Sequence, residues 1–203
     1  PFADAKQGDF RISANVQNAS LAYVPSYLLP KDSLPWPGLQ QLYGELIIDH
    51  ATLLAKVDRG VLAGTAIQLG KAEGLMTNIY SGAQLQVTAD AKGPLADVLG
   101  VVNRSPLGGL LDNVLATASA TGVADYKLKL GFPIADVDRA TVAGSIVLAG
   151  NDLQITADTP RLQRARGTVA FTESGFSVTG GSARAVGGDV RIEGGLSLQT
   201  GAA

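Results

Sequence analysis

Three stretches of the chain repeat one pattern: a glycine, apolar residues two and four positions later, and another apolar residue nine positions after the glycine. The three patterns begin at Gly44, Gly144 and Gly167. Turn-forming residues separate the two arms of each repeat, namely Asp49-His50, Gly150-Asn151-Asp152 and Ser174-Gly175. Successive side chains of a strand point to opposite faces, so residues two apart share a face. The repeats therefore predict three β-hairpins, each with an apolar face and a polar face.

Alternating apolar and polar residues continue outside the repeats. Residues 8–23 predict a further hairpin that turns at Asn18, residues 61–69 predict a strand with a glycine bulge, and residues 84–91 alternate most clearly. From residue 141 to residue 198 the pattern is hairpin after hairpin. The expected fold is mainly β: an open, curved antiparallel sheet, or β-groove, built from stacked hairpins.

Two segments interrupt the strand pattern. Residues 25–38 contain four prolines and Trp36, which predicts a loop rather than a central strand. Residues 94–116 change to a helical period, with apolar stripes Leu95/Val98/Leu99/Val102 and Leu107/Leu110/Leu111/Val114. We expect two short helices here, the second with Ser105 as its N-cap, packed on an end or rim of the sheet.

Composition narrows the function further. The 203 residues carry a formal net charge of -2 and no Lys/Arg cluster typical of a nucleic-acid surface, so no nucleic-acid partner is expected. There is no cysteine, which excludes disulfides, thiol nucleophiles and cysteine-based zinc sites. The chain starts without Met, and its last strand still alternates near the terminus. We therefore expect residues 1–203 to be a single segment of a longer protein.

Catalytic chemistry is not evident in the sequence. His50 is the single histidine and is expected to be a solvated turn residue, because partners for a general base or a metal are absent nearby. Asp136 and Asp138 lack the remaining ligands of a calcium loop. The cluster of Arg161, Arg164 and Arg166 could meet a phosphate headgroup, although solvated loop charges are the simpler interpretation. We expect no enzyme activity, no metal and no cofactor.

Several motifs, taken in order, resemble one family. These are Trp36-Pro37 before a glycine-led hairpin, Ser105-Pro106-Leu107 opening a helix, a strand ending Leu130-Gly-Phe132-Pro133-Ile134, and the segments beginning at Val142 and Arg166. Together they resemble an internal segment of the YhdP-type AsmA-like proteins of Gram-negative bacteria, over nearly the whole chain. The motifs are diffuse and include no catalytic residue.

This resemblance implies a periplasmic segment of a protein anchored in the inner membrane, with a long β-groove that bridges toward the outer membrane. The implied function is conduction of phospholipids, and the implied partners are phospholipid acyl chains, neighbouring segments of the same long chain and the two membranes. Each methylene of an acyl chain costs about 0.8 kcal/mol to hold in water, so a carrier needs a continuous apolar surface.

The candidate groove residues are the apolar members of the glycine-led repeats, which have matched parity: Leu46, Ile48, Leu53, Ile146, Leu148, Leu153, Ile155, Val169, Phe171, Phe176 and Val178. Small residues expected on the same face include Ala14, Ala55, Ala89 and Ala91. A structural or adhesive β-sandwich or solenoid with a dry packed core remains the alternative, because alternation buries one face in both folds.

Overall fold

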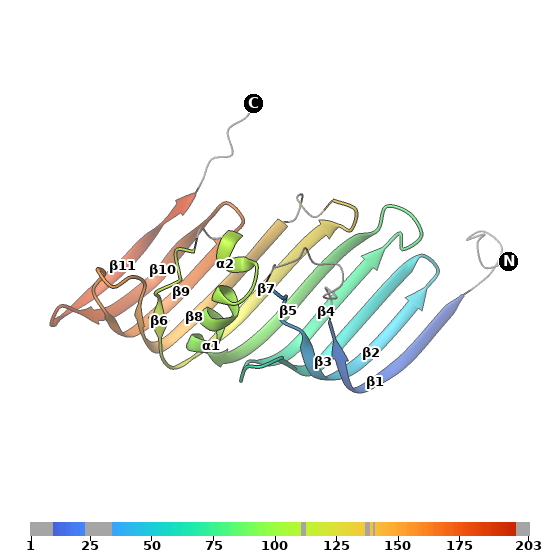
Figure 1. Cartoon of the computed structure of the whole chain (residues 1–203), viewed down its shortest axis with the longest axis horizontal. Helices are drawn as coiled ribbons and strands as arrows, with labels where there is room; N and C mark the ends of the chain where they lie inside the picture. The colour runs from blue at the N-terminus through green and yellow to red at the C-terminus, as the bar shows by residue number, and fades with distance from the viewer. Residues whose placement is uncertain (1–9, 23–33, 111–112, 137–138, 140, 198–203) are drawn as a thin grey trace, which may run out of the picture.

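The computed structural model describes residues 10–22, 34–110, 113–136, 139 and 141–197 (Figure 1). Strands account for 66% of the protein, and they form an open antiparallel sheet of 11 strands that does not close into a barrel. The strands are β1 (Arg11–Leu21), β2 (Leu39–Asp49), β3 (Thr52–Leu62), β4 (Gln68–Thr77), β5 (Gln84–Pro94), β6 (Ser119–Ala120), β7 (Val123–Pro133), β8 (Thr141–Gln154), β9 (Leu162–Thr172), β10 (Gly175–Ala185) and β11 (Gly188–Ser197). Two short helices, α1 (Leu95–Asn103) and α2 (Leu107–Leu110), follow β5. The expected fold class is thus confirmed.

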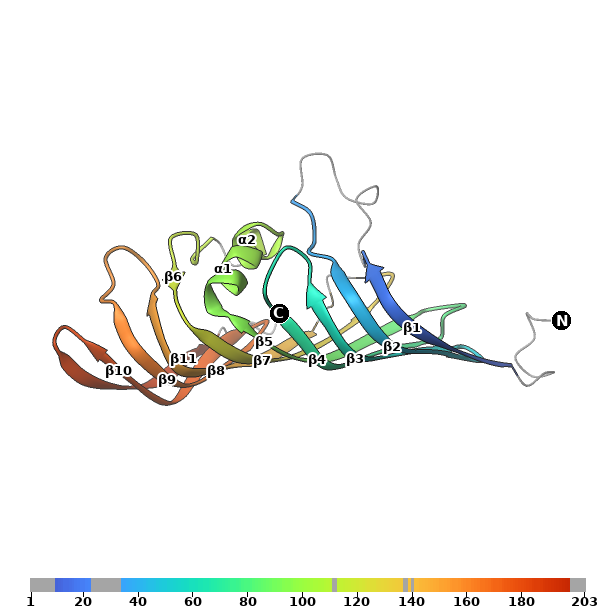
Figure 2. The same ribbon diagram turned by 90° about the horizontal axis from the view of Figure 1, so that it is seen from below.

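The order of the strands in space follows their order in the chain. The sheet runs β1-β2-β3-β4-β5-β7-β8-β9-β10-β11, while the two-residue strand β6 pairs with β8 off this path. Each long strand pairs with its neighbours in sequence, except that α1, α2 and β6 intervene between β5 and β7. The described strands therefore form one layer, which curves toward the side that carries the helices (Figure 2).

The register of the strands sorts their side chains into two faces. On one face, directly paired apolar residues form a row across five strands: Ile12, Ile48, Leu53, Met76 and Leu85. A second row on the same face runs through Ala91, Tyr126, Ile146, Val169 and Val178. We call the surface formed by these rows, and by the residues at even spacing from them, the apolar face. The small residues Ala14, Ala55 and Ala89 also lie on it.

The opposite surface, which we call the polar face, carries most of the charge. One of its rows pairs Asn15, Glu45, Lys56, Glu73 and Thr88 across β1 to β5. An ion pair joins Lys92 Nζ to Asp125 Oδ1 at 2.8 Å between β5 and β7. Some apolar residues also lie on this face, among them Ile47, Leu54 and Leu75, which are in register, and Val147. The two faces therefore differ in overall polarity, although the polar face also carries some apolar residues.

Several residues expected in turns lie in bulges instead. The predicted hairpin over residues 8–23 is wrong: β1 is one strand along β2, and Asn18 (φ 52°) sits at a register shift. The predicted turn at residues 150–152 is also wrong, because β8 continues through Gly150 (φ 117°) and its register to β9 shifts there. Conversely, the predicted strand over residues 61–69 contains the turn between β3 and β4. The hairpins expected at Gly44 and Gly167 correspond to β2–β3 and β9–β10.

The helices lie over one end of the central strands, on the side toward which the sheet curves (Figure 2). This is the side of the apolar face, because the carboxylate of Asp97 in α1 acts on the phenol of Tyr126. The backbone N–H of Leu95 donates to Gly122 O at 2.9 Å, and Asp97 Oδ2 accepts from the N–H of Ala66 at 2.7 Å. In the connection to α2, Ser105 Oγ accepts from the N–H of Leu107 at 3.3 Å, as expected of an N-cap. Within the predicted stripe, Val114 lies in a turn beyond α2 and is exposed, and Leu111 lies outside the described residues. Of the predicted loop 25–38, only residues 34–38 are described, and they form no strand.

Candidate functional site

The apolar face is the first candidate site, and much of it has no covering layer. Leu128 is 40% exposed although β7 is a central strand, and Phe176 is 49% exposed. The described residues include only seven buried apolar residues: Leu42, Ile47, Ile67, Leu95, Ala124, Ala165 and Ala183. Along β5, half-buried residues on the apolar face alternate with exposed residues on the polar face. This is the burial pattern of a single sheet rather than of a packed core between two sheets.

The structure brings nine of the eleven candidate residues onto this face by direct register: Leu46, Ile48, Leu53, Ile146, Leu148, Val169, Phe171, Phe176 and Val178. Leu153 lies beyond the bulge in β8, where it pairs with Leu162 and Ala120. Ile155 follows the end of β8 and is 38% exposed. The turn expected in the repeat that begins at Gly144 is a bulge in β8. Counting by twos from Gly144 therefore does not predict the face on which Leu153 and Ile155 lie.

One glycine of the repeated pattern makes room for an aromatic ring. A Cβ on Gly144 would overlap Cζ of Phe171 and would lie 2.7 Å from Lys127 O, closer than real Cβ contacts. Phe171 is the direct cross-strand partner of Gly144 on the apolar face. The ring therefore lies across the glycine, which gives a physical reason for a glycine at this position of the pattern.

Helix α1 covers the apolar face where β5 and β7 meet it. Tyr126 Oη donates to Gly93 O at 3.2 Å across the two strands. Burial raises the pKa of the Tyr126 phenol to about 12, with further contributions from the carboxylates of Asp97 in α1 and Asp125. Ala124, two residues earlier in β7, is 1% exposed. This edge of the apolar face is thus closed, whereas Leu128, two residues further along β7, is open.

Asn151 fastens the helical insertion to the sheet. Its side chain is 1% exposed, and Nδ2 donates to the carbonyl oxygens of Thr121 at 3.0 Å and Val123 at 3.2 Å. Its Oδ1 accepts from the N–H of Ala149 at 3.0 Å, across the bulge at Gly150. The side chain of Asn151 thus stabilises both the bulge in β8 and the segment of residues 121–123, which connects the helices to β7.

The described residues offer little for catalysis or metal binding. No group of three or more His, Cys, Asp or Glu residues that could hold a metal ion occurs among them. His50 lies in the β2–β3 turn, where its Nδ1 pairs with Oδ1 of Asp49, and its side chain is exposed. None of the helices in the described part of the chain is long and apolar enough to cross a membrane.

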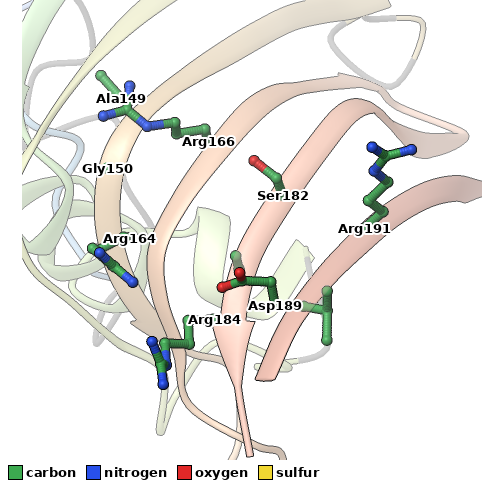
Figure 3. Close-up of a pocket in the computed structure, with 10 residues that line it drawn as sticks. Ala149, Gly150, Arg164, Arg166, Ser182, Arg184, Asp189 and Arg191 are labelled. Atoms are coloured by element: carbon green, nitrogen blue, oxygen red, sulfur yellow. The ribbon is translucent and has the colours of Figure 1, made fainter. Parts of the chain in front are cut away.

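A second candidate site lies on the C-terminal strands of the sheet. The sequence pattern did not predict that its residues come together. A hollow of about 660 Å³ is lined by residues of β8 to β11 that include four arginines, Arg164, Arg166, Arg184 and Arg191, and Asp189 (Figure 3). Of the three arginines grouped in the sequence, Arg161 instead pairs with Asp152 at 3.2 Å. A bulge in β10 sets the register of this strand to β9 and β11, and so decides that Arg184 and Arg191 lie beside Arg166.

Comparison with known proteins decides the family. A family model described as YhdP protein matches residues 1–201. The chain belongs to the YhdP protein family. Membership indicates a lipid-transport-related family of the cell envelope, one that is not known for catalysis. Neither a curated protein nor a solved structure matches the chain.

Proposed function

We propose that the apolar face holds the acyl chains of phospholipids and forms one segment of a periplasmic groove that conducts them between the inner and outer membranes. The observation that carries this proposal is a continuous apolar surface, in register across the sheet, that stays partly open to solvent at Leu128 and Phe176. Membership of the YhdP protein family supports it.

The energetics favour such a surface for acyl chains. An exposed apolar surface of this extent is costly in water, and burial against an acyl chain regains about 25 cal/mol per Å² of apolar area. Contacts of this kind are non-directional, so a lipid can slide along the face without breaking hydrogen bonds. The role is non-catalytic, and specificity for a headgroup is not required of this face.

The curvature of the sheet is consistent with the same role. The sheet bends toward its apolar side (Figure 2), which favours enclosure of an acyl chain over exposure on a flat surface. Register shifts occur between β1 and β2, β8 and β9, and β9 and β10, near the strand ends over which the helices lie. Bulges increase local twist and bend the strands that contain them. The alternative of a dry β-sandwich requires a second sheet, and the described strands form one.

Site-specific photo-crosslinking tests the proposal. A photoreactive amino acid would replace Leu128 or Phe176 on the apolar face, and as matched controls Lys129 or Ser177, the adjacent residues on the polar face. The protein would be irradiated in Gram-negative cells and its adducts identified by mass spectrometry. We expect phospholipid adducts at the first pair of positions and not at the second. Equal labelling of both faces, or no lipid adduct at either apolar position, would overturn the proposal.

A further inference from the structure

The arginine-lined hollow lies on the opposite side of the sheet from the apolar face. Arg166 pairs in register with Ala149 and Ser182, and Ser182 in turn pairs with Arg191. These residues have the opposite parity to Leu148, Val169 and Ile192, so they belong to the polar face. In Figure 3 the helices lie behind the strands that present the arginines. An acyl chain on the apolar face therefore does not reach this hollow.

Two arginines flank one serine across adjacent strands, and in Figure 3 their guanidinium groups point outward from it, that of Arg166 toward Gly150 on β8. Arg166 on β9, Ser182 on β10 and Arg191 on β11 are direct cross-strand partners. Neighbouring strands are about 4.8 Å apart, which places the Cα atoms of the two arginines roughly 10 Å from each other with the serine between them. Arginine side chains are long enough to span that distance, so rotation of the two side chains toward Ser182 would bring both guanidinium groups onto one ligand.

The arginines of the hollow outnumber its carboxylates. Asp189, the direct partner of Arg184 in register, is the acidic residue among those that line it. Within the described ranges, none of the four has a carboxylate at ion-pair distance, although other cations do, as in Arg11–Asp49 and Arg161–Asp152. Arg184 donates instead to the carbonyl of Gly187 at 3.3 Å. A local excess of positive charge therefore stands out in a chain whose net charge is -2.

Glycine and serine keep the hollow open. The Nη2 atom of Arg166 lies 3.7 Å from the place that a Cβ on Gly150 would occupy, so the guanidinium extends over a position of β8 that has no side chain. Ser182 is the smallest hydroxyl side chain and leaves room between the two arginines. The volume of about 660 Å³ falls in the range of about 300–1,000 Å³ typical of small-molecule sites.

We propose that Arg166, Ser182 and Arg191 form a binding site for phosphate groups on the polar face, with Arg164 and Arg184 at its margin. Guanidinium groups donate paired hydrogen bonds that match phosphate oxygens, and the serine hydroxyl adds a further donor. A ligand with more than one phosphate uses more of the surrounding charge. The same chemistry is offered by anionic lipid headgroups at a bilayer surface and by free phosphate compounds.

Binding of inorganic pyrophosphate to the chain, measured by calorimetry, tests the site. We expect the double variant Arg166→Gln/Arg191→Gln to bind at least tenfold more weakly than the unchanged chain. Arg161→Gln, which removes the same kind of charge from a paired arginine outside the hollow, should change the affinity less than twofold. Far-ultraviolet circular dichroism would show that both variants keep the strand content. No binding to the unchanged chain, or equal weakening in both variants, would overturn the proposal.

Vesicles identify the source of the phosphate. Co-sedimentation would compare phosphatidylcholine vesicles with and without added phosphatidylglycerol. An increment due to phosphatidylglycerol that pyrophosphate competes away, and that the double variant loses, assigns the site to a bilayer surface. Pyrophosphate binding without this increment assigns it to a free phosphate compound. Pyrophosphate has no acyl chain, so failure at this site would leave the proposed lipid conduction untouched.

Discussion

Placing a carboxylate in the middle of the apolar face tests whether that face is open. Leu128 lies on the central strand β7, where its direct partners in register are Ala89 and Gly144. It is 40% exposed, so roughly three-fifths of the burial of a leucine, or about 1–2 kcal/mol, would be lost in Leu128→Asp. The new carboxylate can reach water and needs little desolvation. Lower strand propensity adds up to about 1 kcal/mol.

Two further variants calibrate this result. Lys129→Asp puts the same side chain at the next position of β7, on the polar face, and measures the propensity contribution together with the reversal of one exposed charge. Ala124→Asp puts it on the same face as Leu128 where the residue is 1% exposed, and there an unpaired buried carboxylate should cost several kcal/mol. Guanidinium unfolding followed by circular dichroism would give the three changes in the free energy of unfolding.

We expect Leu128→Asp to exceed Lys129→Asp by about 1–2 kcal/mol and to fall well below Ala124→Asp. In cells, the same variant should impair the outer-membrane barrier, because charge interrupts the path for acyl chains. If Leu128→Asp instead destabilises the protein as much as Ala124→Asp, the apolar face is a dry core. The reasoning that led to lipid conduction would then be refuted for this segment.

Three other predictions follow from particular contacts. Gly144→Ala should destabilise the sheet by about 1–3 kcal/mol through collision with Phe171, whereas Gly188→Ala, which meets no atom within 4 Å, should be near neutral in the same unfolding assay. Asn151→Ala should cost about 1–3 kcal/mol and increase hydrogen exchange in the helical insertion, because buried groups lose their partners; unchanged exchange there would contradict its role as a fastener. The pKa of Tyr126 is raised on folding, so its contribution to stability is present below pH 10 and is lost between about pH 10 and about pH 12. Ultraviolet titration against Tyr126→Phe should show this late-titrating phenol, and a difference spectrum centred at pH 10 would disprove it.

The sequence predicted the parts of the fold that depend on local pattern. Period-two alternation identified the apolar side of β5, and the change of period after Gly93 identified the helical insertion. The pattern predicts turns at Asn18 and Gly150 because bulges and turns use the same residue types, those that tolerate positive φ. Which of the two forms depends on the pairing partner, and that partner lies far away in the sequence.

The arginine hollow could not be found in the same way. Counted by twos from Phe176, Ser182 and Arg184 would share the apolar face. The register shift between Val178 and Gly181, where Gly180 has φ 60°, moves both residues to the polar face instead. A single inserted residue thus decides which side of the sheet receives the charge, and alternation in sequence carries no trace of it.

In the described part of the chain the long strands pair in sequence order within one layer, which makes stability nearly one-dimensional. As in repeat proteins, the free energy of unfolding becomes a sum of strand contributions and neighbour interfaces, without a central core that ties distant strands together. Fraying should begin at β1 and β11 and proceed inward, while β5, β7 and β8, joined by the helical insertion, resist longest. A conduit built on this plan can change length by whole hairpins while the remaining strands keep their contacts.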